Sequence, residues 1–376
     1  MHISRLQFEN FRNFQSLDIK LDQGFVVLCG PNGMGKTNLL EGIYFGASLR
    51  RFPSSKLRQL VQDGQSFMRV KIGSTKDEEQ NLEVFCQQAP PQGAGAGQDG
   101  ARYKCQFKLD NQKETRARYS GAVPVISFLP EDLNLLTHSP GARRRFLDEC
   151  LSVASQSYRY ALSQYERALQ QRNHLWRKIQ NHEMQESDLG IWDNKLSEFG
   201  CEITGLRQSF VSFINQNLQL ILDTVSPKLQ AVKFIYHNSG ETDKANFLQK
   251  LVNLRPRERE TGTTLVGPHR DDFEVFWQER EVVGYVSRGQ LRSLTLALKI
   301  LERNYLEQHL KERPIILLDD IFSEFDKEHR QQVIEFLRSF DQVFASTANL
   351  EEVKPFLPET AQIFLIRSGQ IVKNGV

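Results

Sequence analysis

Hydrophobic and polar positions along the chain follow two periods, close to two residues in some segments and between three and four in others. Short alternating or continuous apolar runs are typical of strands. They predict strands at residues 3–8, 17–21, 25–29, 81–86, 103–109, 125–129, 232–236, 273–277, 315–318 and 342–346. The runs 25–29 and 315–318 are continuous, which is typical of strands covered on both faces of a parallel sheet.

Helical periodicity dominates the middle of the chain. No glycine or proline occurs from Ala142 to Leu189, and apolar residues recur in steps of four and three, as in a coiled-coil seam. The first seam contains Leu147, Leu151, Ala154, Tyr158, Ala161, Tyr165 and Ala168, and continues at Leu175 and Ile179 after an interruption at Arg172. A second seam contains Leu196, Phe199, Ile203, Leu206, Phe210 and Phe213.

The polar break between the seams predicts an antiparallel pair of helices. A first helix without interruption would be about 70 Å long, and a break near 181–187 would shorten it. The pattern fits both an ordinary helical bundle and a protruding arm. Further helices are expected from Asn38, near 290 and near 327–340.

These elements predict an α/β domain that a helical segment interrupts. We expect residues 1–130 and 260–376 to form the two halves of this domain, with 131–259 as an inserted helical lobe. Residues 87–100 contain too few apolar side chains to pack, and we expect a mobile loop there.

The composition is that of an ordinary globular protein, with 39% hydrophobic residues, 25% charged residues and a net charge of +2. Any nucleic-acid surface must therefore be local. The five cysteines, at 29, 86, 105, 150 and 201, form no CxxC pair, and we expect free thiols in a reducing cytosol. No secretory signal or apolar span of about 18 residues is present, which predicts a soluble, cytoplasmic protein without a membrane partner.

A glycine-rich motif follows the strand at 25–29 and precedes a helix. Glycines at three positions and a Lys-Thr pair match the spacing of a P-loop, in which backbone amides and the helix dipole bind phosphate. Lys36 is expected to contact the β- and γ-phosphates, and the Thr37 hydroxyl to bind Mg²⁺. The candidate ATP-binding residues are Gly30, Pro31, Asn32, Gly33, Met34, Gly35, Lys36, Thr37 and Asn38.

Two adjacent carboxylates end the continuous strand at 315–318. Alone, Asp319 and Asp320 could be an acidic turn after a core strand. A P-loop ATPase needs a distant acid for Mg²⁺, and the carboxyl ends of parallel strands meet at one edge of the sheet. We therefore expect Asp319 to hold the metal and Asp320 to polarise the attacking water.

Ser287 to Gln290 immediately precede the helix expected near 290. Ser287 fits an ordinary helix cap. Ser287, Gly289 and Gln290 also resemble the signature motif of ABC-type ATPases, which contacts the γ-phosphate of a nucleotide held by the partner subunit. The motif lies before Asp319 with one helix between them, which is the order found in that class. Residues 323–326 match the position of the D-loop of such ATPases.

Several motifs together resemble the RecF family of SMC-like ABC ATPases. They lie at residues 6–14, 30–43, 139–148, 267–272, 287–293 and 318–326, and occur in the family's order over nearly the whole chain. The resemblance implies an SMC-like ATPase head with an inserted helical, coiled-coil-like lobe. It further implies a slow ATPase that forms an ATP-dependent homodimer on duplex, gapped or junction DNA. Its expected partners in recombinational repair are RecR, RecO and, downstream, RecA.

The sequence departs from related ATPases at two positions. ABC transporters usually have glutamate where Asp320 stands, and the shorter side chain agrees with a slow switch rather than a motor. No histidine follows the strand at 342–346, where transporters have their switch histidine. Thr347 lies in that neighbourhood, and its role is open. An ABC-type ATPase that does not act on DNA, such as a transporter motor, is the alternative function.

Other polar residues allow two interpretations. Arg12 resembles the basic residue near the γ-phosphate in SMC-like heads, and equally fits a surface arginine. Residues 267–272 could form a metal or catalytic site, although we prefer a structural junction. Basic clusters could contact DNA phosphates or be solvated faces; their members are Arg50, Arg51, Lys56, Arg58, Arg102, Lys104, Lys108, Lys113, Arg116, Arg118, Arg143, Arg144 and Arg145.

Overall fold

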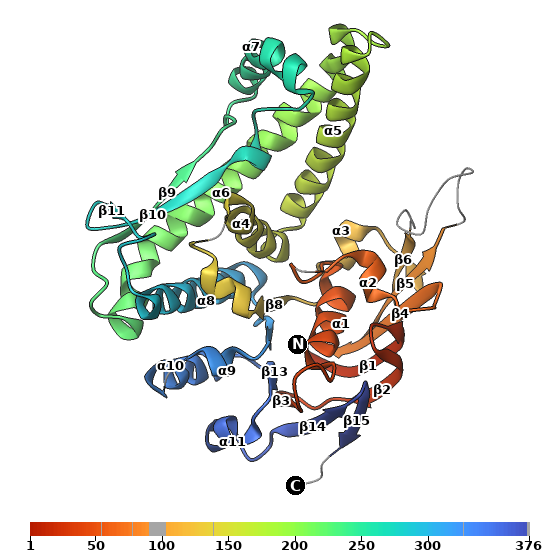
Figure 1. Ribbon diagram of the computed structural model, residues 1–376, viewed down its shortest axis with the longest axis vertical. Coiled ribbons are helices and arrows are strands. Elements are labelled where there is room, and N and C mark those ends of the chain that lie inside the picture. Colours follow the sequence, from red (N-terminus) through yellow and green to blue (C-terminus); the bar gives the residue numbers. More distant parts are fainter. Residues whose placement is uncertain (54, 77, 90–102, 138, 326, 374–376) are drawn as a thin grey trace. The chain divides into compact units, whose positions relative to one another are not determined.

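The computed structural model describes residues 1–53, 55–76, 78–89, 103–137, 139–325 and 327–373. The chain forms two compact units (Figure 1). Residues Met1–Asp132 and Leu306–Val376 form the first unit, and Leu133–Tyr305 form the second. No helix in the described part of the chain is long and apolar enough to cross a membrane.

A mostly parallel sheet carries the P-loop and the Asp319–Asp320 pair of the first unit. Its strand order is β15-β14-β3-β13-β12-β8, and all neighbours are parallel except the β14–β15 hairpin. The strands are β3 (Gly24–Cys29), β8 (Val125–Phe128), β12 (Ile315–Leu318), β13 (Gln342–Thr347), β14 (Gln362–Arg367) and β15 (Gln370–Lys373). The four residues of β12 are fully buried, as the continuous apolar run predicted.

The second sheet of this unit is antiparallel, with the order β2-β1-β4-β5-β6-β7. It consists of β1 (His2–Phe11), β2 (Phe14–Lys20), β4 (Phe67–Thr75), β5 (Glu79–Gln88), β6 (Tyr103–Leu109) and β7 (Gln112–Lys113). The predicted strands did not include β4, although Met68, Val70 and Ile72 alternate with two basic residues. The predicted loop at 87–100 lies mostly outside the described residues, because 90–102 are not among them.

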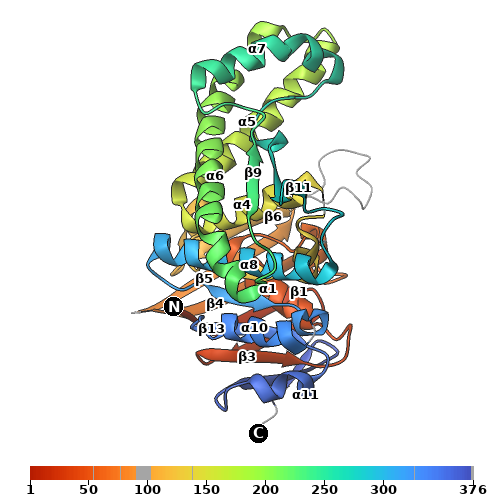
Figure 2. The ribbon, with the colours of Figure 1, turned by 90° about the vertical axis from the view of Figure 1, so that its left-hand side faces the viewer.

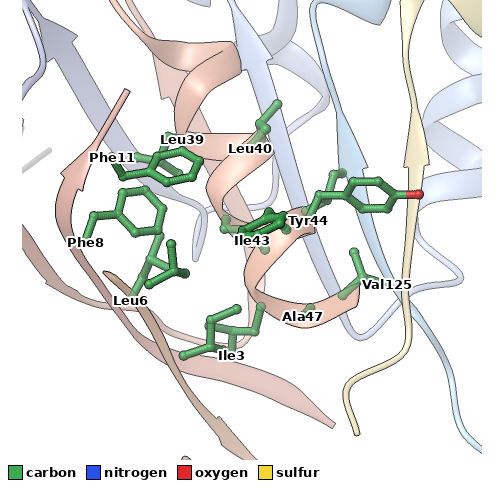
Figure 3. Packing of buried hydrophobic residues seen from close by; sticks show 14 of the residues in the cluster. Ile3, Leu6, Phe8, Phe11, Leu39, Leu40, Ile43, Tyr44, Ala47 and Val125 are labelled. Atoms are coloured by element: carbon green, nitrogen blue, oxygen red, sulfur yellow. The ribbon is translucent and has the colours of Figure 1, made fainter. Parts of the chain in front are cut away.

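Helix α1 (Lys36–Ser48) packs against strands of both sheets of the first unit. Leu39, Leu40 and Ile43 are fully buried in the same cluster as Leu6 and Phe11 of β1 (Figure 3). This packing fixes the helix that follows the P-loop. Shorter helices complete the unit: α2 (Leu57–Leu60), α3 (Arg116–Tyr119), α9 (Ile321–Glu324), α10 (Lys327–Leu337), α11 (Leu350–Val353) and the 3₁₀ turns η2 (Pro130–Asn134) and η5 (Lys354–Phe356).

Two of the five cysteines form a disulfide, so the prediction of five free thiols is wrong. Cys86 on β5 and Cys105 on β6 are directly opposite in the antiparallel register, with 4.1 Å between their Cα atoms. Sequence spacing could not reveal this pair, because strand register brings the two residues together. Cys29, Cys150 and Cys201 are not disulfide-bonded.

The second unit contains the predicted pair of long helices. Figures 1 and 2 show α5 (Gln156–Gln180) and α6 (Gly190–Val225) side by side, connected through the 3₁₀ turn η3 (Glu186–Leu189). The first run is not one helix, because α4 (Pro140–Ala154) ends at Ser155, whose backbone is extended. The Ser155 hydroxyl accepts a hydrogen bond from the Tyr158 amide and thereby caps α5.

Arg172, which interrupts the seam, is fully buried and paired. Its guanidinium contacts Asp193 of α6 and Glu258 of α7 (Lys244–Thr261), each at 2.7 Å. A polar residue in the apolar seam is therefore compensated by two carboxylates from neighbouring helices.

A small sheet and a helix complete the second unit. The sheet has the order β11-β10-β9, and its strands are β9 (Val232–His237), β10 (Asp272–Trp277) and β11 (Arg280–Glu281). Helix α8 (Arg288–Leu310) begins in this unit. The unit extends to Tyr305, beyond the predicted limit of 259, because β9 packs on α6, β10 packs on α4, and the Tyr305 ring lies 4.6 Å from that of Phe210.

Candidate nucleotide-binding site

The P-loop connects β3 to α1 in a backbone conformation that requires glycine. Gly35 has a φ of 109°, and a Cβ atom there would lie 2.4 Å from Asn13 Nδ2. A Cβ atom on Gly30 would lie 2.4 Å from the Ile366 carbonyl oxygen. Gly33 has a φ of 80°, and no neighbouring atom would lie within 4 Å of its Cβ. The loop is therefore closely supported at both ends and open at Gly33, as a phosphate cradle must be.

Lys36 directs its ammonium group into this loop. Its Nζ donates to the carbonyl oxygens of Gly30 at 2.6 Å and Pro31 at 3.0 Å, and lies 3.4 Å from Asn32 Oδ1. The residue is 6% exposed. Folding thus places a largely desolvated positive charge against carbonyl groups of the loop, and a lysine in a P-loop is suited to contact phosphate.

Thr37 and Asp319 are brought together by the sheet, as the sequence predicted. The Thr37 hydroxyl lies 2.9 and 2.8 Å from the two carboxylate oxygens of Asp319. Burial raises the pKa of Asp319 above its ordinary value, and hydrogen bonds from Ser346 and Thr37 oppose that rise. A hydroxyl and a carboxylate are hard oxygen ligands, and Mg²⁺ commonly takes one or two such protein ligands alongside phosphates and water. The donor set therefore fits Mg²⁺.

Ser346 on β13 is a polar contact of this site that sequence reasoning missed. Its hydroxyl donates to Asp319 Oδ1 at 2.7 Å and accepts from the Asp320 amide at 2.9 Å. Asp320 has left-handed backbone angles, φ 49° and ψ 26°, at the start of α9. The neighbouring Thr347 instead hydrogen-bonds to the backbone of Asn349. The candidate switch position thus stabilises a turn, while Ser346 contacts the acids.

Asn13 is a second residue that sequence reasoning missed. It lies in the turn between β1 and β2, where its Nδ2 donates to the Met34 carbonyl at 3.1 Å. Its Oδ1 accepts from Asn38 Nδ2 at 2.8 Å. The Gly369 amide, in the β14–β15 turn, also donates to Met34. Two hairpin turns therefore hold the P-loop from outside.

Arg12 is held by α1. Its Nε and Nη2 both donate to Glu41 Oε2, at 2.9 and 2.6 Å, and Nη2 also contacts the Ser55 hydroxyl. Glu41 is 1% exposed, so the pair is partly desolvated. The arginine is thus part of an ordered ion pair rather than a freely solvated surface residue. Its contact with nucleotide stays a prediction.

The signature residues lie in the second unit at the start of α8. The Ser287 amide donates to Gln290 Oε1 at 2.8 Å, and the Gln290 amide donates to the Ser287 hydroxyl at 3.2 Å. This reciprocal arrangement is a capping box. Ser287 is exposed, and a Cβ atom on Gly289 would meet only the Ser287 hydroxyl, at 3.9 Å. The cap and a role in binding nucleotide across subunits are compatible. Of the residues in the predicted D-loop, Asp326 lies outside the described part.

Residues 267–272 form a partly buried structural junction within the second unit. Asp271 lies 3.6 Å from Arg207 of α6, and Asp272 pairs with Arg143 of α4 at 2.7 Å. His269 contacts the Tyr165 hydroxyl of α5 at 2.7 Å. No cluster of three or more His, Cys, Asp or Glu side chains suited to a metal occurs in the described ranges. The motif therefore joins α4, α5 and α6 to β10.

The basic clusters differ in the ion pairs and hydrogen bonds that their side chains form within the protein. Arg143 is paired with Asp272, and Arg144 donates to the Asp271 carbonyl oxygen at 2.7 Å. Arg143 and Arg144 therefore stabilise the junction at residues 267–272. Around α1, by contrast, Arg116 Nη2 lies 3.3 Å from the Leu49 carbonyl oxygen, which brings two sequence-distant clusters together. Their exposed members are Arg51, Lys56, Arg58, Lys104, Lys113, Arg116 and Arg118; Arg102 lies outside the described residues.

Comparison with known proteins agrees with this geometry. The family model described as RecF/RecN/SMC N terminal domain matches residues 2–369. The chain is 31% identical to proteins named DNA replication and repair protein RecF from Bacillus cereus (strain B4264) and Bacillus thuringiensis (strain Al Hakam). Each alignment covers 99% of this chain and 98% of the relative.

Solved structures give the same grouping. A structure of the recombination mediator protein RecF with ATP, described as part of the RecFOR pathway, superposes with a TM-score of 0.84 at 26% identity, covering 100% of this chain and 98% of that one. An SMC head bound to the C-terminal winged-helix domain of ScpA has a TM-score of 0.54 at 14% identity over the same shares, a likeness of fold alone. The chain therefore belongs to the RecF/RecN/SMC family, and its full-length relatives place it among the RecF proteins of that family.

Proposed function

We propose that this protein is a slow, DNA-linked ATPase that acts in recombinational repair as an ATP-closed homodimer. The observation that carries the proposal is the convergence of Lys36, Thr37 and Asp319 at one edge of the parallel sheet. Each of these residues has the chemistry that ATP and Mg²⁺ require, and each is held by contacts within the first unit.

Different residues of the chain bind the phosphates, hold the metal and orient the attacking water. Amides of the P-loop and Lys36 bind the phosphates, while Thr37 and Asp319 hold Mg²⁺, which when bound neutralises phosphate charge. Asp320 orients and polarises the attacking water from the residue next to the metal ligand. Its backbone amide donates a hydrogen bond to Ser346, which restrains the backbone from which the carboxylate extends. Hydrolysis by one short carboxylate suits a switch that changes state slowly.

Closure of two subunits would complete each site. At the amino end of α8, Ser287 is exposed and Gly289 is partly exposed, so a second copy can approach them. In the closed dimer they contact the γ-phosphate held by the partner's P-loop, with Gln290 fixing the Ser287 backbone. ATP binds the closed state more tightly than the open one, and that difference in affinity drives closure.

The DNA and protein partners are proposed from the relatives. Proteins 31% identical over almost the full length are named for DNA replication and repair, and a similar solved structure is named for the RecFOR pathway. We infer that the closed dimer binds duplex DNA near gaps or junctions and works with RecR and RecO to promote loading of RecA. Exposed basic residues around α1 supply charge for phosphate contacts.

ATP-gated DNA binding tests this proposal. For the unaltered protein, we expect ATP with Mg²⁺ to raise affinity for duplex DNA about tenfold, a usual size for coupling between sites. The Lys36→Met variant should lose that gain and keep the basal, salt-dependent affinity, while Lys71→Met, an exposed lysine on β4, should retain the gain. The measurement is a DNA-binding titration by fluorescence anisotropy at several salt concentrations. DNA affinity that is the same with and without ATP in all three proteins would show that ATP does not gate DNA binding. The absence of any affinity for duplex DNA would favour the alternative ATPase that does not act on DNA.

A further inference from the structure

Strand β13 lies between the strand that leads into the P-loop and the strand that leads into the acids. It pairs in parallel with β3 on one side and with β12 on the other. Asp319 and the P-loop therefore follow strands that are not neighbours. A side chain near the carboxyl end of β13 is in a position to control the spacing between the two halves of the site.

Ser346 occupies that position, opposite Leu28 of β3 and one residue before the end of β13. The residue is fully buried. Its hydroxyl has one proton, which it donates to Asp319 Oδ1, and it accepts the amide proton of Asp320 in another direction. One buried oxygen atom thus contacts the side chain of the first acid and the backbone of the second.

Both hydrogen bonds restrict conformation. One restricts the side chain of Asp319 and the other restricts the backbone of Asp320. Asp319 Oδ1 is also within 2.9 Å of the Thr37 hydroxyl, so Ser346 and Thr37 approach the same carboxylate oxygen and define its rotamer. Asp320 has a φ of 49°, a conformation that aspartate adopts less readily than glycine. The hydrogen bond from its amide to Ser346 holds this conformation and with it the direction of the Asp320 side chain.

We propose that Ser346 is a positioning residue that sets Asp319 for the magnesium ion and Asp320 for the attacking water. The inference rests on the proposed ATPase function and adds one residue that couples the two acids. Thr347, whose hydroxyl is engaged by Asn349, does not provide this coupling. A serine in the middle strand of the sheet thereby contributes to both the metal-binding and the hydrolytic half of the site.

The test compares Ser346→Ala and Ser346→Thr with Ser74→Ala. Ser74 is a buried serine on β4 of the same unit whose hydroxyl lies 3.4 Å from the Gln80 carbonyl oxygen, away from the acids. Affinity for a fluorescent ATP analogue is measured with Mg²⁺ and with EDTA, and steady-state hydrolysis gives kcat and KM. Partners that orient metal ligands typically contribute 10–100-fold to metal affinity or activity.

For Ser346→Ala we expect unchanged nucleotide affinity in EDTA, a loss of about tenfold in the gain that Mg²⁺ provides, and a fall of about tenfold or more in kcat. Ser346→Thr, which keeps the hydroxyl, should restore both quantities to within about threefold, and Ser74→Ala should leave both unchanged. If the alanine variant does not fold, Ser346→Cys, which keeps the volume and donates weakly, replaces it with the same expectation.

Two results would overturn the inference. One is a Ser346→Ala protein that binds Mg²⁺-ATP and hydrolyses it like the unaltered protein. The other is a loss of nucleotide affinity of equal size with Mg²⁺ and with EDTA, which would indicate a merely structural role. An unaltered protein that neither binds nor hydrolyses ATP would instead contradict the proposed function itself, so the two failures are distinguishable.

Discussion

Asn13 supports the P-loop through two hydrogen bonds, one of which it donates and one of which it accepts. Its amide nitrogen donates to the Met34 carbonyl and its amide oxygen accepts from Asn38. Both partners belong to the P-loop or to the first turn of α1, and neither is expected to react. Asn13 should therefore contribute to how well the loop is formed for ATP, and little to the rate after binding.

We predict that Asn13→Ala raises KM for ATP several-fold and changes kcat by less than about twofold, since one or two hydrogen bonds contribute about 1 kcal/mol each. Asn13→Asp should be impaired as well, because a carboxylate accepts from Asn38 but cannot donate to Met34. Steady-state kinetics at saturating Mg²⁺ measures both constants. A fall in kcat with unchanged KM would show instead that Asn13 acts in the chemical step.

Among single residues, the sequence predicted which side chains lie together where residue type and spacing define a motif. Lys36, Thr37 and Asp319 belong to motifs, and the structure brings them together. Asn13 and Ser346 could not be found in that way, because asparagine in a turn and serine in a strand are common. Their importance arises from the order of strands in the sheet and from the path of two hairpin turns.

Among the elements of the second unit, the junction at 267–272 places one titratable ring, that of His269, in a partly buried position. His269 Nε2 lies 3.0 Å from the Thr264 carbonyl oxygen, which can only accept, so Nε2 carries the proton. Nδ1 therefore accepts from the Tyr165 hydroxyl. Burial lowers the pKa of His269 to about 4, and the nearby Arg270 adds to this, while the contact with Thr264 opposes it.

This geometry predicts a loss of stability in mild acid. A folded-state pKa below the unfolded value of 6.5 means that the unfolded chain binds the proton more readily. The stabilising contribution is complete above pH 6.5 and is lost as the pH falls towards 4, with an upper limit of about 3 kcal/mol. Urea unfolding between pH 7 and 5 measures it, with His269→Gln as the comparison. Equal pH dependence in the two proteins would contradict this account of the junction.

The elements themselves were mostly predictable, and the exceptions have physical reasons. The seam residues Tyr158, Ala161 and Tyr165 are buried as their spacing predicted. The break at Ser155 was not foreseen, because periodicity continues through it while one extended residue changes the direction of the chain. The Cys86–Cys105 disulfide depends on strand register, which hydrophobic patterning does not define.

For the whole molecule, the division of motifs between two units is the central feature. The P-loop, Asp319 and Asp320 belong to the first unit, whereas Ser287 and Gly289 belong to the second. The predicted segments 1–130, 131–259 and 260–376 were drawn from the order of motifs along the chain. The limits of the two units are instead set by which residues pack together. A site that needs both sets of motifs is completed by a second copy in the proposed dimer, so ATP should change the mass of the particle.

The most direct test is the mass of the Asp320→Asn protein with ATP and Mg²⁺, measured by light scattering with and without duplex DNA. Asparagine keeps the size of the side chain and removes its charge, so ATP should persist and the closed state accumulate. We predict a particle of twice 43.4 kDa with ATP, and a monomer when Lys36→Met or Ser287→Arg is added to Asp320→Asn. A mass of 43.4 kDa with ATP, with and without DNA, would contradict the ATP-closed dimer.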